Sequence, residues 1–267
     1  MCVINVDATS SAQVLDAFFI QSNLRSFHRY IAHQEIVYSP GIVSMFSYLP
    51  LPFYNAVFCD DGVDQKTYLK QLEVFKERKV PFVWFAEENS DIAKDLIANG
   101  GKSVGVFQGG AAPIPLDKLI DFTIEGITLT RVQTQEDIAA QVDLLSVCLK
   151  LSEENKRVRL KIAQEQFAET SPLQHWIAIK EGKAIAVLGL FINKDCAMMM
   201  NAVTLEPYRK TGLATALAIQ SMKYAVGKGC TLGMACIDPN ENAKGIGLKF
   251  DGKAYWRYTP IVFSPNP

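Results

Sequence analysis

The chain has 267 residues, of which 49% are hydrophobic and 21% are charged, and its formal net charge is -1. This length is sufficient for two domains of about 130 residues each, and the apolar content excludes a disordered chain. Because a nearly neutral chain has no long-range field to hold a polyanion, the charge argues against nucleic acid or an anionic membrane as a partner.

The longest apolar run extends from Ala184 to Ile192, which is much shorter than the roughly 20 residues of a spanning helix. The first residues show no basic segment followed by an apolar one, as a secretory signal has. We therefore expect no membrane insertion and a cytoplasmic setting, in which the cysteines, none of them in a CxxC pair, stay reduced. His28, His33 and His175 lack metal-ligand spacing, so we expect ordinary polar residues and no metal site.

The first half alternates between strand and helix patterns after an initial helix. Periodicity predicts helices over 10–23, 64–79 and 91–99, the last one ended by Gly100, and strands over 42–48, 53–59, 80–85 and 104–107. Two glycines and two prolines lie within residues 109–115, which favours an inter-domain connection. We therefore divide the chain into domains 1–124 and 125–267.

The second half begins again with a strand and contains a predicted antiparallel meander. Ser152 is a favourable helix N-cap, and turns at residues 181–182 and 193–194 separate three strand-like runs. The predicted elements are strands over 127–132, 175–180, 184–192, 197–205, 231–237 and 254–263, with helices over 135–150, 152–169, 212–226 and 242–249. The fold class is α/β with a mixed sheet.

One segment carries recognisable chemistry: a strand runs through a short loop directly into the helix that begins near Gly212. The loop reads Arg209-x-x-Gly212-x-Ala214. A helix N-terminus has free amide donors and a partial positive charge, and small residues let a phosphate approach it closely. Arg209 and Lys210 add positive charge, and Thr215 adds a hydroxyl. The segment therefore predicts a cradle for a pyrophosphate.

With its flanking strands, this segment resembles the GNAT superfamily of acyl-CoA-dependent N-acyltransferases. The resemblance covers residues 127–263 and includes Asn240-x-x-Ala243 after the next strand. The first half, with Asn55-x-Val57 and Pro81-Phe-Val-Trp84, resembles the non-catalytic amino-terminal domain of tandem GNAT proteins. It has no R-x-x-G-x-[GA] motif. The resemblance implies two GNAT-like domains, each a mostly antiparallel sheet flanked by helices, and a degenerate first domain.

The resemblance also implies a cofactor site and its residues. The strand end would pair with the pantetheine arm, the loop amides would hold the pyrophosphate, and Asn240 would bind the pantetheine. The implied residues for acetyl-CoA are Val203, Thr204, Leu205, Arg209, Lys210, Thr211, Gly212, Leu213, Ala214, Thr215 and Asn240. A gap between the strand that ends at Leu205 and the strand that starts at Thr231 would admit the thioester.

The sequence offers more than one candidate for each catalytic group. Many family members carry a tyrosine that protonates the leaving thiolate, and the matching position here is Gly247. Tyr255 is our candidate for that acid, with Cys236 and Tyr258 as alternatives. For the base that takes the amine proton we favour Glu206, with Asp238 as the alternative.

Three functions remain open on these observations. The first is an N-acetyltransferase that moves an acetyl or short acyl group from coenzyme A to a primary amine of a small-molecule acceptor. The second, suggested by Gly247, is a non-catalytic acyl-CoA sensor or scaffold. The third is an α/β interaction protein without a ligand. Because tandem domains in this family form an intramolecular pseudo-dimer, we expect a monomer.

Overall fold

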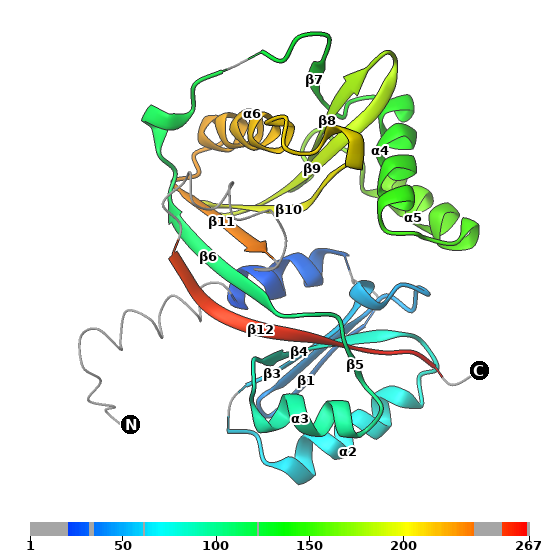
Figure 1. The fold of residues 1–267 in the computed structure, drawn as a ribbon. Helices are drawn as coiled ribbons and strands as arrows, with labels where there is room; N and C mark the ends of the chain where they lie inside the picture. The colour runs from blue at the N-terminus through cyan, green and yellow to red at the C-terminus, as the bar shows by residue number, and fades with distance from the viewer. Residues whose placement is uncertain (1–20, 32–34, 61, 122, 238–252, 266–267) are drawn as a thin grey trace. The chain divides into compact units, whose positions relative to one another are not determined.

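The computed structural model describes residues 21–31, 35–60, 62–121, 123–237 and 253–265. Its contacts divide the chain into two compact units (Figure 1). Unit 1 contains the residues up to Gly110 together with the C-terminal strand, and unit 2 contains Ala111 to Cys236. In both units a mostly antiparallel sheet is flanked by helices, which confirms the predicted mixed α/β class.

Unit 1 is built on the sheet order β1-β2-β3-β4-β12. Only β3 and β4 pair in parallel, and the short β5 pairs with β12. The strands are β1 (Glu35–Ser39), β2 (Ile42–Phe46), β3 (Asn55–Cys59), β4 (Phe82–Glu87), β5 (Lys102–Ser103) and β12 (Lys253–Phe263). The helices are residues 21–31, η1 (Pro52–Tyr54), α2 (Gln65–Lys76) and α3 (Asp91–Ala98). The strand β1 was not predicted, and most of the predicted helix 10–23 lies outside the described residues.

Local signals set the helix ends of unit 1. The Asp64 side chain caps α2 by accepting from the Thr67 amide, and the Ser90 side chain caps α3 in the same way. Gly100 follows α3 with a φ of 94°, a left-handed conformation that glycine adopts without strain. One core joins both helices to the sheet, with Trp84 and Leu72 fully buried in it.

Unit 2 contains the predicted meander. Its strands β7 (Thr128–Arg131), β8 (Leu173–Lys180), β9 (Lys183–Asn193) and β10 (Cys196–Thr204) pair antiparallel in sequence order, and β11 (Leu232–Ile237) pairs in parallel with β10. Its helices are η2 (Leu116–Lys118), α4 (Gln135–Cys148), α5 (Glu153–Gln166), η3 (Glu206–Tyr208) and α6 (Leu213–Gly227). The β8–β9 turn has positive φ at Glu181 and Gly182, as a tight hairpin requires.

The two faces of the unit 2 sheet carry different helices (Figure 1). Leu217 of α6 shares a core with Trp176 and Leu188, whereas Leu145 of α4 shares one with Ile177 and Val187. Because successive residues of a strand point to opposite faces, α6 covers one face and α4 covers the other. Ser152 caps α5 as predicted, accepting from the Asn155 amide.

The stretch expected to be an inter-domain connection contains a strand that was not predicted, because residues 107–113 form β6 (Phe107–Pro113). Pro113 is its last residue, where a missing amide donor is tolerated. The unit division falls inside this strand, between Gly110 and Ala111. The division of the sequence at residue 124 stays a prediction.

None of the helices that the structure describes has the length and apolarity needed to cross a bilayer. The predicted helix 242–249 lies outside the described residues.

Candidate functional site

The C-terminal end of β10 separates from β11 where the sequence predicted a gap. The two strands pair in parallel from Cys196 to Met199, and in the described residues no further pair joins them, although β10 continues to Thr204. A register shift on the β9 side lies between Met200 and Val203, and Asn201 there has a φ of 50°. This irregularity is a β-bulge, which bends a strand away from its neighbour. It therefore explains the opening.

The loop that follows β10 is held by its own hydrogen bonds. The Leu205 amide donates to the Ile185 carbonyl at 2.9 Å, which keeps the strand end on β9. The Arg209 side chain turns back, and its Nε donates to the Thr204 carbonyl at 3.1 Å. The Thr211 hydroxyl donates to the Tyr208 carbonyl at 2.7 Å. The strand end and the loop thus form one ordered segment that leads into α6.

Gly212 leaves the first backbone amides of α6 without a side-chain cap. It is the N-cap residue with φ 89° and ψ −1°, and α6 has no side-chain cap. Only glycine adopts this left-handed conformation without a steric penalty. Because no side chain covers the first amides of α6, they stay available to a bound anion, at the positive end of the helix dipole.

The predicted cofactor residues around Gly212 divide by exposure. Arg209, Lys210 and Thr211 are exposed, whereas Val203, Thr204, Leu205, Ala214 and Thr215 are half-buried. Leu213 is buried and anchors the first turn of α6 in the core shared with Trp176. The structure therefore brings ten of the predicted residues, 203–205 and 209–215, into one continuous segment, with the charged side chains outward.

The remaining predicted site residues lie outside the segments 203–205 and 209–215. Glu206 is exposed and begins η3, directly after the strand end. Tyr255 lies within β12, but its side chain is outside the described part of the structure, as are Asn240, Asp238 and Gly247 altogether. Of the alternative acids, Cys236 is half-buried in β11. Tyr258 is buried in unit 1, where its ring stacks on Trp256 with centroids 4.2 Å apart.

The end of α4 was not predicted to lie near this segment. Burial raises the pKa of the Cys148 thiol, the last residue of α4, while the positive charge of Arg209 acts in the opposite direction. This interaction places the α4 terminus beside the loop. No motif in the sequence indicates it, because 60 residues separate the two positions along the chain.

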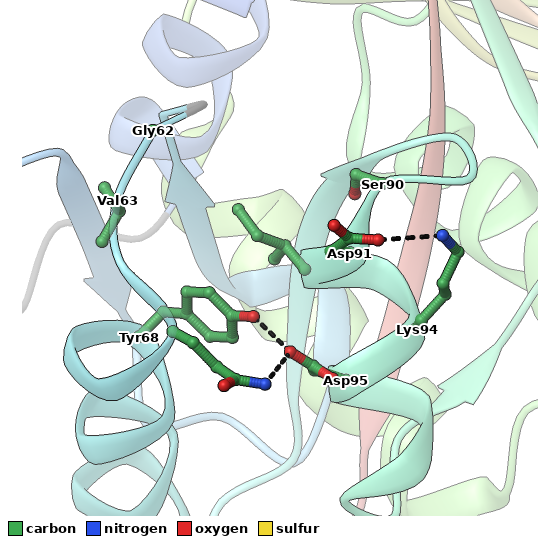
Figure 2. Close-up of a pocket in the computed structure, with 9 residues that line it drawn as sticks. Gly62, Val63, Tyr68, Ser90, Asp91, Lys94 and Asp95 are labelled. Atoms are coloured by element: carbon green, nitrogen blue, oxygen red, sulfur yellow. Dashed lines mark hydrogen bonds and ion pairs between the residues drawn. The ribbon is translucent and has the colours of Figure 1, made fainter.

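Unit 1 contains a separate cavity of about 540 Å³ between the first turns of α2 and α3 (Figure 2). Tyr68 of α2 and Asp95 of α3 point toward one another across it, and the tyrosine hydroxyl donates to the carboxylate. Gln65 also donates to Asp95, at 2.7 Å. Burial, followed by the interaction with Asp95, raises the pKa of Tyr68.

The chemistry of this cavity differs from that of the unit 2 loop. Asp95 and Asp91 both line it, and Lys94 is paired with Asp91 at 2.9 Å. The first turn of α2 already has an acidic cap, Asp64. Carboxylates at a helix N-terminus repel a phosphate and occupy its donors, so the cavity lacks the features of a pyrophosphate cradle. Among the described residues no group of three or more His, Cys, Asp or Glu side chains is arranged to hold a metal ion.

Comparison with known proteins agrees with the geometry of unit 2. Residues 140–248 match the model of the acetyltransferase (GNAT) family. No match was found among curated protein sequences.

Solved structures match over nearly the whole chain. A GCN5-related N-acetyltransferase from Kribbella flavida has a TM-score of 0.68 at 16% identity, covering 93% of this chain and 96% of that one. One from Sphaerobacter thermophilus has a TM-score of 0.60 at 15% identity, with coverages of 85% and 78%. A tandem GNAT protein from the clavulanic acid biosynthesis pathway has a TM-score of 0.57 at 13% identity, with coverages of 85% and 79%. At these identities the likeness shows the fold, and together with the family match it means that this chain carries a GNAT acetyltransferase domain at residues 140–248.

Proposed function

We propose that the protein is an N-acetyltransferase that transfers an acetyl or short acyl group from coenzyme A to a primary amine of a small molecule. The observation that carries the proposal is the uncapped N-terminus of α6 at Gly212, directly after a strand that has separated from its neighbour. A nucleotide pyrophosphate needs such an anion site, and an extended thioester arm needs unpaired strand backbone beside it.

The residues present fit this co-substrate. The amides of the first α6 turn would bind the pyrophosphate, with Arg209 and Lys210 supplying positive charge. Residues 203–205 offer strand backbone on the side that β11 leaves open. Asn240 stays a predicted contact to the pantetheine arm.

The reaction itself requires positioning and proton transfer more than covalent help. A neutral amine attacks the thioester carbonyl, the new C–N bond forms, and the C–S bond breaks to release the thiolate. We assign Glu206 as the base, because it is exposed directly after the strand end. Tyr255 stays the predicted acid that would protonate the thiolate. A thiol with a pKa of about 8.5 also leaves without full protonation, so loss of this acid would slow turnover without stopping it.

Calorimetric titration of acetyl-CoA tests the binding half of the proposal. We expect Arg209→Ala to weaken binding by about tenfold or more, the usual loss for a hydrogen bond to a charged group. Gly212→Asn keeps the left-handed backbone accessible but places a side chain where the phosphate would lie, so it should weaken binding while the melting temperature changes little. Arg157→Ala, an exposed arginine on α5, is the matched control and should bind as the wild type does.

Thiol release on a panel of primary amines tests the transfer half. Thiol release with the wild type on at least one amine, reduced in Arg209→Ala and Gly212→Asn, would support the assignment. Binding without thiol release on any amine contradicts a transferase, and no binding at all contradicts the cofactor site. The expected monomer and the expected cytoplasmic setting stay predictions.

A further inference from the structure

A row of three residues crosses the unit 2 sheet at the bulge of β10. His175 of β8 pairs with Gly189 of β9, and Gly189 pairs with Met200 of β10, the last residue before the register shift. All three lie on the face that carries α4, because His175 and Ile177 are two residues apart on one strand and Ile177 belongs to the α4 core. The row therefore meets the mouth of the proposed thioester gap.

Gly189 allows two side chains to converge at this point. A Cβ atom at position 189 would lie 3.2 Å from the His175 ring and 3.2 Å from the Met200 side chain. Such contacts are tighter than side chains normally accept, so the glycine lets the imidazole lie directly over the backbone. The imidazole and the thioether thus form the surface beside the bulge.

The His175 ring is neutral and has no partner. Burial, assisted by the positive charge of Arg159, lowers the pKa of His175 to about 3. In the described part of the chain neither ring nitrogen makes a hydrogen bond. A neutral imidazole offers one donor and one acceptor nitrogen, and the described residues use neither of them.

Arg159 approaches this row from α5. It lies one turn before Ala163, and Ala163 and His175 line the same small cavity of about 30 Å³. Residues four apart share a helix face, so Arg159 lies on the α5 face that is turned toward His175.

The charge of Arg159 is unbalanced in this position. Lys156 and Lys161 on the same helix pair with Asp143 and Glu165, but no carboxylate within the described ranges pairs with Arg159, which is half-buried. A partly buried guanidinium without a counter-charge is costly, and a planar carboxylate is the anion that suits it best.

We propose that the acceptor pocket of unit 2 lies on this face beside the bulge and takes an amine that also carries a carboxylate, as an amino acid does. Arg159 binds the carboxylate, and the His175 imidazole accepts a hydrogen bond from the amine. This inference rests on the proposed transferase function and narrows its acceptor class.

The neutral His175 imidazole suits the reactive form of the amine. It accepts a hydrogen bond from an N–H group of the amine and leaves the nitrogen lone pair free. His175 then orients that lone pair toward the thioester carbonyl. The C–N bond forms and the C–S bond breaks as in the proposed reaction, and Glu206 takes the amine proton.

The test compares amino acids with their C-terminal amides, which keep the amine and lack the carboxylate. Thiol release from acetyl-CoA is measured over the twenty L-amino acids and their amides. We expect at least one amino acid to exceed its amide by about tenfold or more in kcat/KM, the scale of a charge-assisted hydrogen bond. Arg159→Gln should remove this preference mainly through KM, Arg159→Lys should restore part of it, and the matched control Arg157→Gln should keep it.

His175→Gln should lower kcat while the preference for the acid remains, which separates orientation of the amine from recognition of the carboxylate. Equal rates with acids and amides, no rate with either, or an unchanged preference in Arg159→Gln would overturn the inference. Calorimetric binding of acetyl-CoA to the same samples is read separately. Normal binding with equal acid and amide rates rejects only the acceptor class, whereas absent binding rejects the proposed function itself. Melting temperatures identify any variant that has not folded.

Discussion

The buried His28 predicts a specific loss of stability in acid. It is 2% exposed in helix 21–31, among the rings of Phe27, Phe58 and Phe85 at centroid distances of 5.0 to 5.5 Å. Its Nε2 donates to the Phe53 carbonyl, and its Nδ1 has no partner. Burial lowers the pKa of His28 from 6.5 to about 3, so the folded protein holds this ring neutral.

The sign and size of the effect follow from proton linkage. Below pH 6.5 the unfolded chain takes up a proton at His28, whereas the folded chain binds this proton only near pH 3. The free energy of unfolding therefore falls as the pH falls through this window. A pH of 5 lies about 1.5 units below the pKa of the unfolded histidine. Proton uptake by the unfolded state therefore lowers the free energy of unfolding by about 2 kcal/mol at pH 5 relative to pH 8.

The assay is urea unfolding at pH 8 and at pH 5 for the wild type and for His28→Gln. Glutamine keeps a donor for the Phe53 carbonyl and does not titrate. We expect the wild type to lose about 2 kcal/mol more than the variant between the two pH values, whatever the variant's stability at pH 8. An equal loss in both proteins would refute the reasoning, because it would mean that His28 can be protonated in the folded state.

Two further predictions concern stability. Asn55 is fully buried, and its side chain accepts from the Ser47 amide at 2.9 Å and donates to the Pro81 carbonyl at 2.7 Å. Asn55→Ala should therefore lower the free energy of unfolding by roughly 3 kcal/mol or more, because several buried backbone groups lose their partners. Urea unfolding measures this loss. Thr134 and Asp137 form a capping box on α4. Thr134→Ala should therefore lower the free energy of unfolding by about 1 kcal/mol, measured by the same urea unfolding. An unchanged free energy of unfolding would contradict the assigned role.

The sequence indicated the segment 203–215 but not the face that carries His175 and Arg159, for a physical reason. Arg209 and Gly212 lie three residues apart, so a local pattern contains the whole loop and its chemistry. Ser152 likewise reveals the start of α5, because a cap acts on its own helix. Arg159 and His175 come together only when α5 packs near β8, and His175 was expected to be an ordinary polar residue.

The strand β6 shows the opposite limitation. Its two glycines and its one proline have low strand propensity, yet residues 107–113 pair into a sheet because tertiary context overrides local preference. The buried Asn55 also lies beyond sequence reasoning, since an asparagine after η1 is typical of an exposed turn. Only the fold shows that its side chain connects two separate backbone segments.

The place of β12 in unit 1 has a consequence for biosynthesis. This strand pairs with β4 and buries Ile261 and Phe263 in the core of unit 1, although all of unit 2 lies between them in the chain. During translation the ribosome releases residues 111–236 before β12, so unit 2 can fold while β4 still lacks its partner. The exposed edge of β4 is then open to other strands for the whole time that unit 2 is made. The order of synthesis therefore makes unit 1 the last part of the protein to be completed.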